Sequence, residues 1–84
     1  MLIKFSDQAW EDYLFWQAKN KGSLKRINTL LRDIQRSPFA GIGKPEALRY
    51  NLSGFWSRRI DEEHRLVYSV QDDTVLIALC RYHY

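Results

Sequence analysis

The sequence predicts an α+β fold in which a two-helix hairpin packs on a small, mainly antiparallel twisted sheet. Two observations predict this class. Apolar residues recur at helical spacing in the first half of the chain, and three apolar segments separated by short polar turns occupy its last third. A chain of 84 residues has too few apolar side chains to fill two cores. Residues 1–84 are therefore expected to form a single domain.

The chain begins with a short apolar segment, Leu2–Phe5, that is typical of a strand. Ser6 or Asp7 is a natural N-cap for a helix that follows. Five residues of that helix recur at spacings of one, three or four and predict its core face: Ala9, Trp10, Tyr13, Leu14 and Gln17. Glu11 and Asp12 fall largely outside this face. An exposed aromatic surface for a partner is the alternative that the pattern favours less.

A second helix is expected after Asn20-Lys21-Gly22, which interrupts the helical pattern, with Ser23 as its N-cap. Its inward face is predicted from strongly helical spacing: Leu24, Ile27, Leu30, Leu31 and Ile34. Its other face carries mostly charged residues and is typical of a solvated surface. Ser37-Pro38 ends this helix because proline disfavours helical geometry in the residue before it.

The stretch "SPFAGIGKPEALRYNLSG" is predicted to be irregular, since it holds both prolines and three of the four glycines. Loops of this length in compact domains often carry function. Three strands then follow as an antiparallel meander: "FWSRRI", "RLVYSV" and "VLIALC".

The last hairpin brings the end of the chain close to Arg65. If residues 72–73 form the turn, Gln71 faces Thr74, and counting outward places Arg65 opposite Cys80. The terminal "RYHY" then lies beside the start of the preceding strand. This count predicts which residues are neighbours but not where their side chains point, because a slip of one residue exchanges the two faces of a strand.

The charge of the chain indicates nucleic acid as the leading class of partner. The formal net charge is +3, and every Lys or Arg after Lys44 is an arginine: Arg49, Arg58, Arg59, Arg65 and Arg81. Arginine presents a planar fork that suits phosphate oxygens and a flat face that stacks on bases. The alternative is a set of solvated arginines on strands.

Other features favour a soluble protein of the cytoplasm. The single cysteine cannot form an internal disulfide, and no apolar stretch approaches the length of a membrane span. The start of the chain lacks the pattern of a signal peptide. One cysteine and two histidines have no spacing typical of metal ligands, so we expect neither a metal nor another cofactor.

The remaining polar residues suit RNA cleavage without a metal. Glu46 lies in the irregular stretch, Arg65 opens a strand, and the chain ends on Arg-Tyr-His-Tyr. The 2′-hydroxyl of RNA is itself the nucleophile, so a protein needs a base, a cation for the phosphate and an acid for the leaving oxygen. Glutamate or histidine can be the base, and histidine or tyrosine the acid. An aromatic side chain such as Tyr82, Tyr84 or Trp56 can stack on a nucleotide base. The alternatives are surface ion pairs, a solvated glutamate and a frayed terminus.

Three stretches of the chain resemble the YoeB toxins of the RelE superfamily: "SPFAGIGKPEALRYNLSGFWSRRI", "EEHRLVYSV" and the terminal "CRYHY". The resemblance extends along the whole length. It implies a RelE-like, microbial ribonuclease type of α+β fold, in a family whose members often form a homodimer. It also implies the toxin of a type II toxin-antitoxin system, an mRNA interferase that cleaves messenger in the A site of the 30S ribosomal subunit. The implied antitoxin is a YefM-like, acidic and partly disordered chain that folds as it binds.

The resemblance also implies roles for single residues. Glu46 matches the general base, Arg65 the group that stabilises the phosphorane, and His83 with Tyr84 the catalytic pair at the C-terminus. The residues expected to contact RNA without taking part in the chemistry are Arg49, Trp56, Arg59, Arg81 and Tyr82. Two rival functions stay open: a gyrase-poisoning toxin of the same superfamily, and a noncatalytic RNA-binding module. The four catalytic candidates together argue against the gyrase branch.

Overall fold

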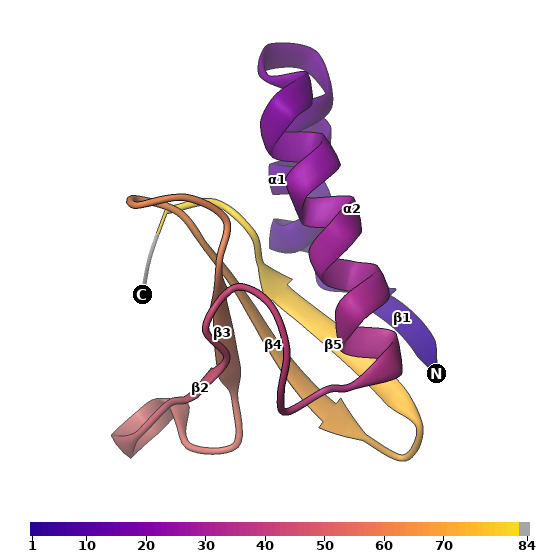
Figure 1. The fold of residues 1–84 in the computed structure, drawn as a ribbon, viewed down its shortest axis with the longest axis vertical. Coiled ribbons are helices and arrows are strands. Elements are labelled where there is room, and N and C mark those ends of the chain that lie inside the picture. The colour runs from indigo at the N-terminus through magenta and orange to yellow at the C-terminus, as the bar shows by residue number, and fades with distance from the viewer. Residues whose placement is uncertain (83–84) are drawn as a thin grey trace.

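A computed structural model of the chain describes residues 1–82. Two helices, α1 (Asp7–Lys19) and α2 (Lys21–Arg36), lie side by side as a hairpin and pack on a five-stranded sheet of strand order β1-β5-β4-β3-β2 (Figure 1). The helices cross the sheet near β1 and β5, while β2 and β3 extend away from them. The predicted α+β class and helix hairpin are confirmed.

Helix α1 begins where expected, but its core face differs from the prediction. Ser6 is the N-cap, and its Oγ accepts the backbone N–H of Ala9 at 3.0 Å. Trp10 and Leu14, predicted to face inward, are 48% and 38% exposed, whereas Asp12 is only 3% exposed. The face that meets the sheet consists of Ala9, Asp12 and Trp16, at spacings of three and four.

The reason is that α1 satisfies the backbone at the end of β5 (Thr74–Leu79). The Asp12 carboxylate accepts the backbone N–H of Cys80 at 3.0 Å, and the Trp16 indole donates to the Cys80 carbonyl at 2.8 Å. A buried backbone group without a partner is costly, so these two polar contacts decide the rotation of the helix. Hydropathy alone does not contain this information.

Four of the five residues predicted for the core face of helix α2 are buried, and Leu24 is partly buried; Ile27, Leu30 and Ile34 are fully buried. Its predicted N-cap is wrong. Asn20 caps the helix, with its side-chain Oδ1 accepting the N–H of Ser23 at 3.1 Å. Asn20 also donates its own N–H to the Trp16 carbonyl and so ends α1. One extended residue therefore separates the two helices, and the expected longer break does not occur.

The predicted meander is present as β3 (Trp56–Arg59), β4 (Arg65–Gln71) and β5, joined in antiparallel pairs. Strand β1 (Leu2–Phe5) adds to β5 in parallel, which makes the sheet mixed. The stretch predicted to be irregular contains a further short strand, β2 (Glu46–Ala47), and a 3-10 turn over Tyr50–Leu52. Strand β2 pairs antiparallel with β3 and forms the edge of the sheet.

The last hairpin has the predicted turn, but its pairing shifts along the strands. Gln71 faces Thr74 and Tyr68 faces Ile77, as the count requires. A β-bulge between Val67 and Tyr68 then moves each partner one residue further along the chain, so that the predicted pairing of Arg65 with Cys80 is wrong. The predicted neighbourhood is confirmed, because the backbone N–H of Arg65 donates to the Tyr82 carbonyl at 2.8 Å.

Candidate functional site

The strand register places three of the candidate residues on one face of the sheet. Residues paired across strands project to the same side, and so do alternate residues of one strand. Tyr68 and Ile77 are paired and buried against the helices. The residues that alternate with these along each strand project from the opposite side of the sheet, which we call the helix-free face. Its members on β2, β3 and β4 include Glu46, Ser57, Arg59, Arg65 and Val67.

Glu46 and Arg65 lie on a diagonal of the helix-free face. Glu46 faces Ser57 on β3, and Arg59, two residues further on β3, faces Arg65 on β4. Two strand spacings and a two-residue rise put the Cα atoms of Glu46 and Arg65 about 12 Å apart. Both side chains are long, so a carboxylate and a guanidinium can approach one ribose and its phosphate from two sides.

Arg65 carries a charge that is hydrogen-bonded but not neutralised. Its Nη1 donates to the carbonyls of Asp61 and His64 at 3.0 and 3.3 Å, which holds the side chain against the β3–β4 turn. Among residues 1–82, no carboxylate lies within ion-pair distance of it. The guanidinium is thus oriented by neutral oxygens while its positive charge remains available to an anion.

Arg59 stands directly opposite Arg65 and is exposed. Like charges at facing positions of neighbouring strands destabilise a sheet by roughly 0.2–1 kcal/mol. A bound phosphate removes that repulsion and can accept hydrogen bonds from both guanidinium groups. The facing pair is therefore an anion-binding arrangement that the rest of the fold tolerates.

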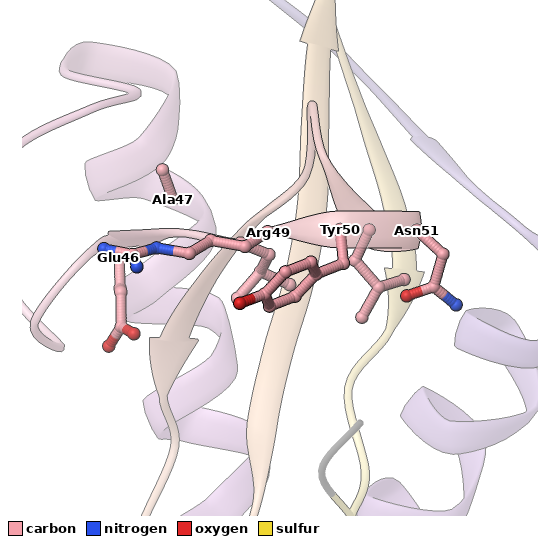
Figure 2. A pocket seen from close by; sticks show the side chains of 7 residues that line it. Glu46, Ala47, Arg49, Tyr50 and Asn51 are labelled. Atoms are coloured by element: carbon pink, nitrogen blue, oxygen red, sulfur yellow. The ribbon is translucent and has the colours of Figure 1, made fainter.

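Glu46 borders a hollow at the edge of the sheet. The hollow has a volume of about 330 Å³ and is lined by residues 46–52. Figure 2 shows the Glu46 carboxylate pointing away from Ala47, as alternation along a strand requires. Arg49 is exposed at the same hollow, and Tyr50, with a positive φ of 58°, is 89% exposed. A carboxylate, a guanidinium and an aromatic ring thus occur together around β2.

Arg81 is held against α1 by a cation–π contact with Phe15. The Arg81 guanidinium lies 3.4 Å from the centre of the Phe15 ring and 4.5 Å from that of Tyr82. Tyr82 is 54% exposed. His83 and Tyr84, predicted to be catalytic, lie outside the described residues.

Trp56 is not brought together with the other candidates. It faces the buried Tyr68, so it projects toward the helix side, where it packs against the core and contacts the Phe39 ring at 4.9 Å between ring centres.

Arg58, one of the arginines that suggested a phosphate contact, is fully buried. It donates to the Tyr68 hydroxyl, to the Asp33 carboxylate and to three backbone carbonyls, those of Ser37, Ala40 and Ile42. These bonds hold residues 37–42 on β3 and so fix the segment that leads to β2. The hydrogen bond from Arg58, helped by the Ile42 N–H, lowers the pKa of Asp33.

Two further observations limit the chemistry of the described residues. Burial raises the pKa of the Cys80 thiol to about 12, so it is protonated and unreactive at neutral pH. Within residues 1–82, no three residues of the types His, Cys, Asp and Glu are grouped closely enough to hold a metal ion.

None of the helices in this part of the chain has the length and apolar character needed to cross a membrane.

Sequence reasoning missed one residue of this region, His64. Its Nδ1 accepts the backbone N–H of Tyr82 at 2.6 Å, across a separation of 18 positions in the chain. The predicted proximity of the tail to Arg65 was the only signal for it. The orientation of the ring depends on the bulge and on packing against Trp16, which no local pattern shows.

Comparisons with known proteins agree with this architecture. Residues 5–84 match the family described as "YoeB-like toxin of bacterial type II toxin-antitoxin system". The chain is 61% identical to the Toxin YoeB of Escherichia coli strain K12 over 84 residues, which is 100% of both sequences. It is similar to a chain of the YoeB-YefM complex from Staphylococcus aureus, with a TM-score of 0.92 and 55% identity over 100% of this chain and 99% of that one. The YoeB dimer from the same organism gives a TM-score of 0.93 at 53% identity, with 100% and 98% coverage.

Proposed function

Because this chain belongs to the family of YoeB-like toxins of bacterial type II toxin-antitoxin systems, we propose that it is a ribosome-dependent endoribonuclease that cleaves messenger RNA in the ribosomal A site. The observation that carries the proposal is the helix-free face, on which Glu46 lies near two facing arginines, Arg59 and Arg65. Such a face offers a base and an anion-binding pair to a single phosphodiester.

The chemistry follows from these groups. The 2′-oxygen of the RNA attacks the adjacent phosphorus while Glu46 takes the 2′-hydroxyl proton. Arg65, with Arg59 beside it, stabilises the negative charge that develops on the phosphate oxygens. The bond from phosphorus to the 5′-oxygen breaks, and His83 or Tyr84 supplies the proton that this oxygen needs. The products are a 2′,3′-cyclic phosphate and a 5′-hydroxyl end, and no step requires a metal.

Positioning of the RNA is the reason for dependence on the ribosome. Glu46 and Arg59 are exposed on the helix-free face, and Glu46 borders a hollow of about 330 Å³. An in-line geometry of the 2′-oxygen and the phosphate must then be supplied by the surface that holds the message. Arg49, Arg81 and Tyr82 are suited to contact the RNA around that point, by charge or by stacking.

The partner proteins follow from the same family. The Staphylococcus aureus relatives are described as a complex with YefM and as a dimer. We propose that a YefM-like antitoxin binds and inhibits this chain, and that the chain forms a homodimer. Action on the ribosome places the active protein in the cytoplasm.

Primer extension on a translated message tests the proposal. Wild-type protein is expected to produce breaks within codons, and Glu46→Ala and His83→Ala are expected to lose them. Glu62→Ala, at an exposed position of the β3–β4 turn, is the matched control and should cut as wild type does. Ribosome binding without any breaks would replace the proposal with a noncatalytic module. Arrest of DNA supercoiling without breaks would replace it with gyrase poisoning.

A further inference from the structure

Tyr82, the last described residue, is held by its backbone on both sides. Its N–H donates to His64 Nδ1 at 2.6 Å, and its carbonyl accepts the N–H of Arg65 at 2.8 Å. Its φ is +63°, in the left-handed region that residues other than glycine rarely adopt. Such a conformation persists only where the surroundings enforce it. These two hydrogen bonds fix the backbone of Tyr82 on both sides of its α-carbon and so favour this conformation.

His64 is itself fixed from several directions. Its backbone N–H donates to Asp61 Oδ1 at 2.7 Å, and its ring packs edge-on against Trp16 with 4.8 Å between ring centres. Its Nε2 lies 3.6 Å from a carboxylate oxygen of Glu63. Imidazole can accept at Nδ1 only when that nitrogen carries no proton, so this contact requires the neutral ring with its proton on Nε2.

We propose that His64 is a positioning residue for the catalytic tail, and that its neutral ring holds the turn at Tyr82 from which His83 and Tyr84 continue. This inference rests on the proposed function, because it presumes that those two residues serve in RNA cleavage. His64 and Arg65 then act together: the side chain of His64 accepts the N–H of Tyr82, and the backbone N–H of Arg65 donates to the carbonyl of the same residue.

A dependence on pH follows from the same geometry. A proton on Nδ1 removes the acceptor and sets a second N–H against that of Tyr82, so protonation of the ring breaks the hydrogen bond that holds Tyr82. Among residues 1–82, Glu63 places a carboxylate beside the ring, while the Asp61 carboxylate and the Arg65 guanidinium contact the backbone N–H and the carbonyl of His64.

Two substitutions separate the hydrogen bond from the packing of the ring. His64→Asn keeps an acceptor oxygen near the position of Nδ1 and does not titrate, whereas His64→Leu fills similar space without an acceptor. The protection factor of the Tyr82 amide proton, which is its intrinsic exchange rate at a given pH divided by the rate measured by NMR, is compared between about pH 8 and about pH 5 and reports on the anchor directly. Because it is read on the free protein, this signal does not depend on RNA cleavage.

We expect the Tyr82 amide of wild type to be protected at the higher pH and to lose protection at the lower one. His64→Asn should stay protected at both values and His64→Leu at neither. In single-turnover cleavage on the ribosome at the higher pH, His64→Leu should lose about tenfold to a hundredfold in rate with unchanged ribosome binding, and His64→Asn less than about threefold.

Equal amide protection in His64→Leu and wild type would overturn the proposal, as would protection of the wild type that does not change with pH. If thermal melting shows that His64→Leu does not fold, the protection of the Tyr82 amide in wild type and in His64→Asn, compared at the two pH values, still tests the proposal. A pH-dependent anchor in a wild type that does not cut messenger would refute the proposed function and not the anchor.

Discussion

Arg58 and Arg65 lie on neighbouring strands and differ in almost every other respect. Arg58 projects to the helix side and is fully buried. Its guanidinium donates hydrogen bonds to the Tyr68 hydroxyl, to Asp33 and to three carbonyls. Arg65 projects to the helix-free face, and within residues 1–82 its side chain donates from Nη1 to two carbonyls of the adjacent turn. The comparison teaches that burial and partners, and not residue type, separate an arginine that holds the fold from one that can bind a phosphate.

Removal of Arg58 should have the largest effect on stability. Arg58→Ala removes a fully buried guanidinium together with its hydrogen bonds to Asp33, to the Tyr68 hydroxyl and to three carbonyls, and this should cost about 3–5 kcal/mol. A small domain has little more than this to lose. Denaturant unfolding followed by circular dichroism measures the change. Arg59→Ala, at the next and exposed position, is the control and should shift stability by less than about 1 kcal/mol. Similar curves for the two variants would show that Arg58 does not hold the loop.

Removal of Arg65 should affect catalysis and leave the fold intact. Arg65→Ala is expected to raise the activation barrier for cleavage by about 2–4 kcal/mol, which corresponds to roughly a thirtyfold to a thousandfold loss of rate. Its unfolding free energy should stay within about 1 kcal/mol of wild type, since its partners are exposed carbonyls. Single-turnover cleavage on programmed ribosomes measures the rate. An unchanged rate would remove Arg65 from the mechanism.

A smaller effect is expected where only one partner of Arg58 is removed. In Tyr68→Phe the hydroxyl that accepts from Arg58 Nε and donates to the Pro38 carbonyl is lost. A single buried hydrogen-bonding group of this kind is worth about 1–2 kcal/mol. Denaturant unfolding should therefore place Tyr68→Phe between wild type and Arg58→Ala. A loss as large as that of Arg58→Ala would mean that the ring hydroxyl, and not the ion pair, holds the loop.

The smallest predicted effect is a decrease in the free energy of unfolding at acid pH. Arg58 lowers the pKa of Asp33 below its ordinary value of 3.8, so the unfolded chain binds a proton at a higher pH than the folded chain does. The stabilisation from this group is complete above the unfolded value and is lost as pH falls through the folded value. Asp33→Asn should unfold more easily than wild type at neutral pH, with a difference that shrinks below about pH 4. A difference that stays constant with pH would contradict the ionised state of Asp33.

The order of elements was predictable because it depends on local pattern. Spacing of three and four identified both helices, and apolar runs between polar turns identified β3, β4 and β5. The rotation of α1 was not predictable, because it depends on Asp12 satisfying a backbone group 68 positions away. The bulge after Val67 was not predictable by counting residues from the turn, since it depends on packing across the sheet.

The candidate site was predictable in composition but not in geometry. Residue types and family resemblance selected Glu46 and Arg65, and the hairpin count put Arg65 near the tail. Their common face required the register of β2 with β3, and β2 itself lies in a stretch rich in glycine and proline that gives no strand pattern. The opposite placement of Trp56 and the burial of Arg58 follow from that register as well.

The central claim is that the helix-free face promotes attack by the 2′-hydroxyl of the bound message. The most direct measurement uses ribosomes programmed with two messages that differ only by a 2′-O-methyl group on the nucleotide that is cut. The account predicts cleavage of the unmodified message, with a 2′,3′-cyclic phosphate end, and no cleavage of the methylated one at equal occupancy. Equal cleavage of both messages would contradict it.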